Sequence, residues 1–396
     1  MSAVLQTPTK ADPVFFPQGL YVHLPFCAAI CTYCDFASEV YAAARAKRYL
    51  PALENELRVQ VAELQRSGGE RFAPRTVFLG GGTPSAFDLG ELNAFFELLE
   101  RHVDLSRVEE FTIEANPGST DAAKLELLLK RGVNRISFGV QSFQPHLLKL
   151  LGRVHGAKQG REAVALARQA GFRNISIDLM HGQPTQTLTQ LRDDLKQAIE
   201  LGTDHISAYG LIYEDGTPLT TAVGKGVVQR LPLEEEAEHY RVVMETLEAN
   251  GLPQYEISNY AKPGLEARHN LIYWRSEAYL GVGVSAASYT LGERRTNFYE
   301  MDAYMSAAQK DGMATESSER LDENARAREA LVLAWRLRDG VDLAEFGRRW
   351  NMNTAALMPR VETFVREGLM ETLPDGRVRI ARAGLHVADG ILSEFV

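Results

Sequence analysis

The chain has 396 residues, of which 45% are hydrophobic and 24% charged, and its formal net charge is −9. This composition predicts an ordinary globular protein of about two to three domains and excludes a disordered chain, a collagen-like fibre and a coiled-coil rod. The acidic balance argues against nucleic acid as a partner. No apolar run reaches the ~18–20 residues of a membrane helix, and residues 1–18 carry no targeting pattern. We therefore expect an N-terminal tail on a cytoplasmic protein.

The first half of the chain alternates short β-branched or aromatic runs with longer segments of helical periodicity. Such alternation predicts an α/β fold with a parallel sheet and right-handed crossovers. Six units fall short of a closed eight-stranded barrel, so we expect an open, partial (βα)6 barrel, with a doubly wound sheet as the alternative. Reactive residues should then lie at the carboxyl ends of the strands. The predicted strands are residues 21–26, 76–81, 111–116, 135–142, 175–182 and 205–211.

The pattern changes beyond about residue 215. A helical run at 233–251 precedes a strand-like segment at 254–261, and from about residue 318 the chain resembles a separate helical domain. Its terminal hairpin, 373–381, suggests a winged-helix shape, but the region has no basic excess, so we expect structural packing rather than DNA binding. The expected organisation is a tail, a partial barrel, a barrel extension and a small, mainly helical C-terminal domain, at 1–18, 19–215, 216–317 and 318–396.

The three cysteines of the chain fall within eight residues, directly after the first predicted strand. Cys27, Cys31 and Cys34 form a C-x3-C-x2-C pattern, which excludes a disulfide framework and indicates a metal site. Zinc would need a fourth ligand, for which His23 is a candidate. A four-iron cluster also takes four ligands, so three thiolates would leave one iron open. The spacing alone leaves both metals possible.

The cysteine pattern at the end of the first strand, followed by Gly80-Gly81-Gly82-Thr83-Pro84 at the end of the second, resembles the radical S-adenosylmethionine (SAM) superfamily. Glycines at such a turn allow the backbone to approach a ligand closely. The resemblance implies a [4Fe–4S] cluster on the three cysteines and SAM chelated to its open iron. It also implies that the reduced cluster can split SAM into methionine and a 5′-deoxyadenosyl radical.

Further strand ends are similar to the family that contains the oxygen-independent coproporphyrinogen III oxidases and the heme chaperones. In that family, acidic and amide side chains hold the amine and ribose of SAM, and an arginine pairs with its carboxylate, as a guanidinium fork does well. The resemblance therefore implies these SAM contacts: Tyr21, Tyr33, Gly81, Gly82, Thr83, Glu114, Gln141, Arg153, Asp178, Ile212 and Ala287.

Two features favour the chaperone branch of this family over the oxidases. The oxidases add a fourth cysteine after the third, whereas Cys34 is followed by Asp35 and Phe36. The segment HNLIYW matches a motif associated with heme binding and implies heme contacts by His269, Asn270, Tyr273 and Trp274. Ala287 departs from the chaperone pattern, which has a histidine there, and its surroundings look like the oxidases. The alternative is therefore radical decarboxylation of coproporphyrinogen III to protoporphyrinogen IX.

The resemblance also implies partners. We expect heme or a porphyrinogen near the carboxyl ends of the strands, covered by residues 254–290, and an apo-hemoprotein acceptor, which can be membrane-associated. SAM cleavage would need an electron donor such as a flavodoxin, and the chain would act as a monomer or dimer. His23, His155 and His181 remain candidates for contacts with substrate, with packing at strand ends as the alternative for each.

Overall fold

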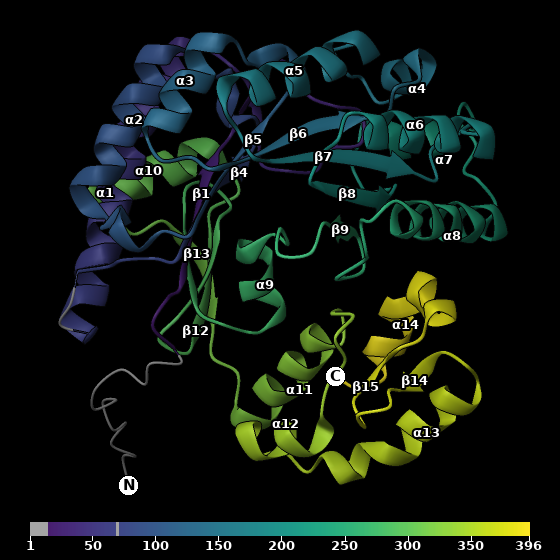
Figure 1. Cartoon of the computed structure of the whole chain (residues 1–396). Coiled ribbons are helices and arrows are strands. Elements are labelled where there is room, and N and C mark those ends of the chain that lie inside the picture. Colours follow the sequence, from purple (N-terminus) through teal and green to yellow (C-terminus); the bar gives the residue numbers. More distant parts are fainter. Residues whose placement is uncertain (1–14, 69–70) are drawn as a thin grey trace, which may run out of the picture.

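One large open sheet organises the chain (Figure 1). The computed structural model describes residues 15–68 and 71–396, so residues 1–14 of the predicted tail lie outside it. In this described part, the sheet has the order β13-β12-β11-β10-β1-β4-β5-β6-β7-β8-β9. Its central strands are parallel and follow one another in chain order: β1 (Gly19–Leu24), β4 (Thr76–Gly81), β5 (Glu110–Ala115), β6 (Arg135–Gln141), β7 (Asn174–His181) and β8 (His205–Gly210).

This strand order distinguishes between the two predicted architectures. A doubly wound sheet reverses direction at a switch point, whereas here every crossover moves the chain one strand further in the same direction. The partial (βα)6 barrel is therefore confirmed. All six predicted strands are present, with shifts of one or two residues at their ends.

The two faces of the parallel strands differ in chemistry because successive side chains point to opposite sides. The outer face is apolar and fully buried, as Leu20, Val22 and Ile136 illustrate. The inner face is polar: Glu114 lies beside Ser137 in the register, and Asp178 lies beside Ser207. Burial of the outer face provides the hydrophobic stabilisation, while the inner face remains free for polar chemistry.

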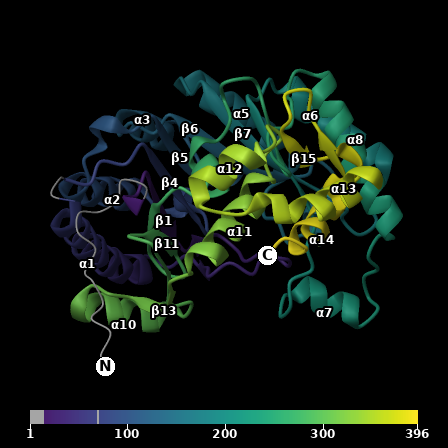
Figure 2. The ribbon, with the colours of Figure 1, turned by 90° about the horizontal axis from the view of Figure 1, so that it is seen from below.

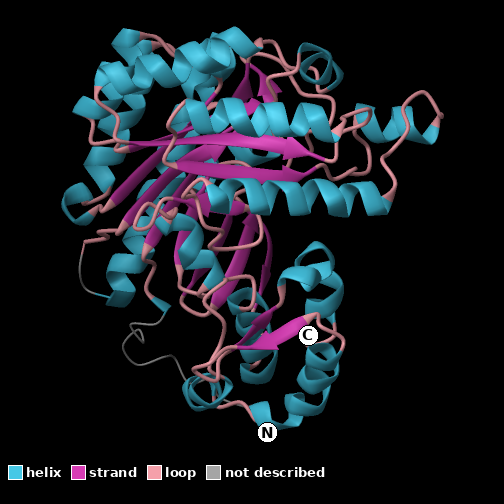
Figure 3. Cartoon of the chain, turned by 45° about the vertical axis from the view of Figure 1, so that its right-hand side comes forward, coloured by secondary structure: helices cyan, strands magenta, loops and turns pink. Residues whose placement is uncertain are grey.

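Helices follow the strands in turn (Figures 1 and 3). Between a helix and the next strand, the chain has a glycine in the left-handed conformation, at Gly132, Gly171 and Gly202. Helices often end at such a residue. The helices of this region are α1 (Ala43–Gly68), α2 (Leu89–His102), α3 (Ala122–Lys130), α4 (Pro145–Leu150), α5 (Ala157–Ala170), α6 (Leu188–Glu200), α7 (Pro218–Gly224) and α8 (Leu233–Ala249).

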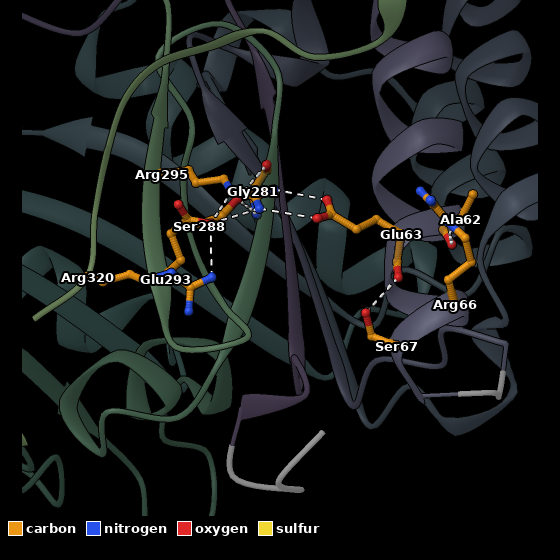
Figure 4. A network of polar contacts seen from close by, with 9 residues as sticks. All are labelled: Ala62, Glu63, Arg66, Ser67, Gly281, Ser288, Glu293, Arg295 and Arg320. Carbon is orange, nitrogen blue, oxygen red and sulfur yellow. Dashed lines mark hydrogen bonds and ion pairs between the residues drawn. The ribbon is translucent and has the colours of Figure 1, made fainter. Parts of the chain in front are cut away.

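A second part of the sheet extends beyond β1. Strand β10 (Tyr279–Val282) pairs parallel with β1, and β11 (Ala287–Thr290), β12 (Glu293–Asn297) and β13 (Thr315–Glu319) follow antiparallel. Figure 4 shows polar contacts that join this extension to α1: Arg295 forms ion pairs with Glu63 of α1 and with Glu293. The remaining elements before the C-terminal region are β2 (Phe26–Cys27), β3 (Glu39–Val40), β9 (Asn259–Ala261), α9 (Arg268–Trp274) and α10 (Met301–Asp311).

The C-terminal region is helical with one hairpin, as the sequence indicates (Figure 2). Its core is built on Trp335, which packs edge-on against Phe395 with ring centroids 4.7 Å apart and donates its indole N–H to the Val378 carbonyl at 3.1 Å. The region contacts the barrel through Arg338, whose backbone N–H donates to the Tyr255 carbonyl at 2.9 Å. Its elements are α11 (Glu323–Ala334), α12 (Leu343–Trp350), α13 (Met358–Arg366), β14 (Met370–Thr372), β15 (Val378–Ile380) and α14 (Ala388–Ser393).

Candidate functional site

The three cysteines lie in the segment that follows β1, at the carboxyl end of the sheet, and all are half-buried free thiols. Their loop is held from two sides. Thr32 donates its backbone N–H to the Leu151 carbonyl at 3.1 Å, and its own carbonyl accepts from the Leu219 N–H of α7 at 2.8 Å. These contacts fix the loop although its thiols share no disulfide.

Close packing explains the glycines that end β4. A Cβ at Gly80 would lie 2.8 Å from a carboxylate oxygen of Glu114, and one at Gly81 would lie 2.5 Å from the His23 ring. Gly81 also has φ +103°, which disfavours any other residue. The backbone N–H of Gly81 donates to Glu114 at 3.3 Å. The segment thus brings peptide groups into direct contact with the inner face of the barrel.

A chain of hydrogen bonds connects the cysteine loop to this face. The Thr83 hydroxyl lies 3.5 Å from the Cys27 thiol and accepts from the Asn116 amide at 2.9 Å. Asn116 in turn accepts from the Arg153 guanidinium, which also lies 3.2 Å from the Cys31 thiol. Asn116 was missed by the sequence reasoning, although it stands two residues after Glu114 in the same strand-end motif. It joins two of the predicted site residues and holds the arginine beside the thiols.

Two carboxyl groups and one amide complete the inner surface. Gln141 has φ +66° at a bulge of β6, and Gly139 leaves space beside it: a Cβ there would lie 3.1 Å from the Gln141 amide nitrogen. Asp178 accepts from the Ser137 hydroxyl at 3.0 Å. The structure thus gathers the polar candidates of four neighbouring strands on one face.

Burial and, to a smaller extent, the negative charge of Asp178 raise the pKa of the Glu114 carboxyl to about 8. The hydrogen bond from the Gly81 N–H acts in the opposite direction and lowers this pKa. Burial also raises the pKa of Asp178, although the Ser137 hydroxyl counteracts this. Carboxyl groups with raised pKa values are often found at functional sites. Such groups are prepared to bind a cation, which would restore their ionised form.

The donor set distinguishes between the two metals considered. Zinc holds thiolates at about 2.3 Å from one ion, and among residues 15–68 and 71–396 no three His, Cys, Asp or Glu side chains are close enough to share an ion. The His23 ring is already engaged, with Nε2 2.9 Å from the Ala37 carbonyl oxygen and Nδ1 3.2 Å from the Tyr21 hydroxyl. A Cys3His zinc site would therefore require His23 to leave both of these partners, whereas a four-iron cluster needs no protein ligand beyond the three thiolates of the loop.

The other predicted SAM contacts lie in different parts of the barrel and of its extension. Tyr21 lies on the inner face with its ring stacked on Phe78 at 6.1 Å. Tyr33 packs on a small apolar cluster of Leu151, Met180, Leu211 and Leu219. Ile212 is 68% exposed in the loop after β8. Ala287 starts β11, with its carbonyl against Gly281. No described contact joins Ile212 or Ala287 to the cysteine loop.

The HNLIYW segment differs in position from the expectation that residues 254–290 cover the carboxyl ends of the strands. It forms α9, and its His269 lies against the first residues of β1 and β4: a Cβ at Gly19 would lie 3.1 Å from the imidazole, and Nδ1 lies 2.7 Å from the Thr76 hydroxyl. The cysteines follow the opposite end of β1, about six residues or ~20 Å away. Glu110, the first residue of β5, accepts from the His269 N–H at 3.0 Å.

The imidazole of His269 is fully engaged within the protein. Its Nε2 lies 2.7 Å from the Tyr273 hydroxyl, its ring stacks on Phe78 at 5.3 Å, and it is 1% exposed. Burial lowers the pKa of His269 to about 3, so the ring is neutral. Tyr273 and Trp274 are half-buried beside it, as is Asn270. A heme contact by these four residues remains a prediction, and the geometry gives the histidine a structural role.

Replacing His269 with alanine is accordingly expected to lower the free energy of unfolding by about 2–4 kcal/mol. The change leaves the Thr76 and Tyr273 hydroxyls without a partner and opens a cavity beneath the sheet. Chemical denaturation monitored by circular dichroism measures this loss. The matched control is His102→Ala, which removes a partly exposed histidine on α2 and should cost under about 1 kcal/mol. Equal stability of the two variants would contradict the structural role of His269.

The remaining histidines occupy different environments. His155 lies with Nε2 3.1 Å from the Val140 carbonyl oxygen. His181 ends β7 and stacks on Tyr240 of α8 at 5.7 Å, and neither of its ring nitrogens has a hydrogen-bond partner among the described residues. Both ring nitrogens of His23 thus have partners, His155 has a partner only at Nε2, and His181 has none within the described chain.

Comparison with known proteins gives the class first. A family model described as the radical SAM superfamily matches residues 21–198, and one described as the HemN C-terminal domain matches residues 321–387. The solved structure of coproporphyrinogen III oxidase (HemN) from Escherichia coli superposes with a TM-score of 0.83 at 22% identity, covering 97% of this chain and 91% of that one. The fold and the cysteine loop thus define a radical SAM protein.

Two curated relatives narrow the class. The heme chaperone HemW of Bacillus subtilis is 35% identical over 96% of this chain and 99% of its own length. The heme chaperone HemW of Escherichia coli is 39% identical over 68% of this chain and 69% of its own. The chain belongs to the HemW family of radical SAM proteins. In the described residues, no helix is long and apolar enough to cross a membrane.

Proposed function

We propose that this chain carries a [4Fe–4S] cluster on Cys27, Cys31 and Cys34, binds SAM beside it, binds heme, and hands the heme to an apo-hemoprotein. The observation that carries the proposal is the three-thiol loop, held by Arg153 and Thr83, in a chain that matches heme chaperones over nearly its full length. A cluster with three protein ligands leaves one iron for SAM, and when reduced it supplies an electron for SAM cleavage.

The residues of the site have separate tasks in this proposal. Arg153, already beside Cys31, pairs with the SAM carboxylate and neutralises part of the thiolate charge. Asn116 holds the guanidinium in place. The backbone after β4 contacts the methionine part, and Glu114 and Asp178 bind the amine and ribose hydroxyls. Gln141, Tyr21, Tyr33, Ile212 and Ala287 complete the proposed SAM surroundings.

This assignment predicts a pH dependence of SAM binding. Glu114 has a pKa raised to about 8, so at pH 6 it is protonated and cannot pair with the ammonium group. Raising the pH from 6 towards 9 ionises it, and the SAM affinity of the reconstituted protein should therefore rise. Isothermal titration calorimetry under anaerobic conditions measures this. Glu114→Gln should bind SAM more weakly at pH 8.5 and lose most of the pH dependence, while an unchanged slope would contradict the role of Glu114.

The alternative is oxygen-independent coproporphyrinogen III oxidase activity, which the oxidase-like sequence around Ala287 favours. One preparation distinguishes the two functions. The protein is reconstituted anaerobically, given a reduced flavodoxin as electron donor, and assayed for coproporphyrinogen III decarboxylation and for hemin binding. Hemin binding without decarboxylation is the expected result. Decarboxylation at enzymic rates would overturn the chaperone proposal, and transfer of heme to a membrane-associated or soluble apo-hemoprotein would identify the acceptor.

A further inference from the structure

A large cleft separates the barrel from the C-terminal region. It has a volume of about 860 Å³ and is bounded by the end of β8, the first half of α8 and residues 385–390. Its lining includes large apolar side chains exposed to solvent: Leu233 is 78% exposed, Ile212 68% and Val387 41%. The volume falls within the ~300–1,000 Å³ of pockets that hold small molecules and cofactors. Exposed apolar side chains gathered around one cleft indicate an apolar ligand.

One polar side chain in the wall of this cleft is buried without a partner. His181 is 6% exposed and lines the cleft, and both of its ring nitrogens lack hydrogen-bond partners within the described chain. Burial lowers the pKa of His181 to about 3, with the nearby His239 as a smaller cause, so the imidazole is neutral. An unsatisfied buried polar group costs free energy. A neutral imidazole without a partner is also the form that ligates iron.

From this we infer that the cleft between β8, α8 and α14 binds the heme macrocycle, with His181 as the iron ligand. This inference rests on the proposed heme function. It places the heme in the cleft rather than at the HNLIYW segment. The two candidate histidines differ in one respect that matters: both ring nitrogens of His269 are engaged by Thr76 and Tyr273, whereas those of His181 are not. His386, on the C-terminal side of the cleft, is exposed.

The charges around the cleft set an orientation for the macrocycle. Arg336 is its one lysine or arginine among the described lining residues, and it forms an ion pair with Asp389 at 3.0 Å. Glu234 and Glu236 lie on the α8 side. Heme propionates are carboxylates, so they should point towards Arg336, where a guanidinium can bind them, and away from α8. The apolar edge of the ring would then contact Leu233.

The same arginine connects the cleft to the HNLIYW motif. The Arg336 guanidinium lies over the Trp274 ring, 5.0 Å from its centroid. A cation held over an aromatic face is favoured electrostatically. Trp274 is therefore a positioning residue for Arg336, so changes in α9 can alter heme binding without any contact between α9 and heme.

Titration of the full chain with hemin, followed by absorbance, tests the site, and it needs neither cluster nor SAM. His181→Ala should weaken hemin binding at least tenfold and shift the heme absorbance, and added imidazole should restore the wild-type spectrum by entering the space left by the side chain. Leu233→Glu, at an exposed position that folding does not require, should weaken binding by placing a charge on the apolar wall while leaving the ligand spectrum unchanged. His102→Ala is the matched histidine control and should bind hemin as the wild type does.

The outcomes separate the site from the function. Wild-type protein that binds no hemin would overturn the proposed chaperone function. Wild-type binding that survives unchanged in His181→Ala and Leu233→Glu would overturn the cleft assignment alone. If His181→Ala does not fold, Leu233→Glu and Val387→Glu still decide, because both positions are exposed: undiminished binding in these two variants would overturn the cleft assignment.

Discussion

Replacing Cys31 with alanine is expected to abolish cluster assembly, leaving iron and inorganic sulfide near background after anaerobic reconstitution. A cubane held by three thiolates cannot retain its place on two, because the fourth iron has no protein ligand to compensate. The Cys31 thiol also lies beside a cation, 3.2 Å from the Arg153 guanidinium. Iron and sulfide analysis of the reconstituted protein measures the result.

The fold should survive this change, since the cysteines are half-buried and the loop is held by backbone hydrogen bonds of Thr32. Asp35→Asn is the matched control: it alters an exposed residue of the same loop and should assemble a full cluster. Full iron and sulfide content in Cys31→Ala would refute the cluster ligand set. Stoichiometric zinc in the wild type would refute the cluster itself.

Glu56→Ala is expected to lower the free energy of unfolding by about 3–5 kcal/mol, the largest loss we expect from a single change outside the apolar core. Glu56 is fully buried on α1 and accepts from the Tyr304 hydroxyl at 2.6 Å, the Asn297 amide at 2.6 Å and the Gly283 N–H at 2.8 Å. Each donor left unsatisfied costs about 1–3 kcal/mol. Denaturation by urea, monitored by fluorescence and circular dichroism, measures the change.

The same residue gives a pH signature. Burial raises the pKa of Glu56 to about 7, against the three donors that favour its ionised form. The folded chain therefore holds this proton more tightly than the unfolded chain, so the contribution of Glu56 to stability falls as the pH rises from about 4.5 to 7. Glu56→Ala should lack this component. Glu63→Ala is the control on the same helix as Glu56. It breaks a partly exposed ion pair with Arg295 of β12 and should cost under about 1 kcal/mol. A similar loss in both variants would contradict the central role of Glu56.

The parallel half of the fold was predictable because its signals are local. Strands buried on one face by helices form short apolar runs, and Gly132, Gly171 and Gly202 mark where helices end. Strands β10–β13 were not predicted, because β10 is glycine-rich and β12 is charged, with the sequence Glu293-Arg294-Arg295-Thr296-Asn297. Such strands are defined by their neighbours in the sheet rather than by their own periodicity.

The candidate site shows the same division. Residues at strand ends could be expected to lie on one face because a parallel sheet brings its carboxyl ends together. The position of α9 was not predicted correctly. The HNLIYW motif suggests a ligand, but it does not indicate at which end of the barrel this helix packs. Asn116 and His181 were undervalued for another reason: the first acts by linking Thr83 to Arg153, and the second is distinguished by the partners it lacks, which only coordinates reveal.

The pairing of β1 with β10 has a consequence for biosynthesis. Gly19 lies beside Tyr279 in the register, so the strand that leads into the cysteine loop keeps one unpaired edge until most of the chain has left the ribosome. Contacts this distant in sequence form late in folding. Glu56 and Tyr49 of α1 likewise gain their hydrogen bonds from the Gly283 and Val284 N–H groups only after that part of the chain has been made. Cluster insertion should therefore be a post-translational event, and a nascent chain truncated before β10 should present its thiols on an unfinished sheet.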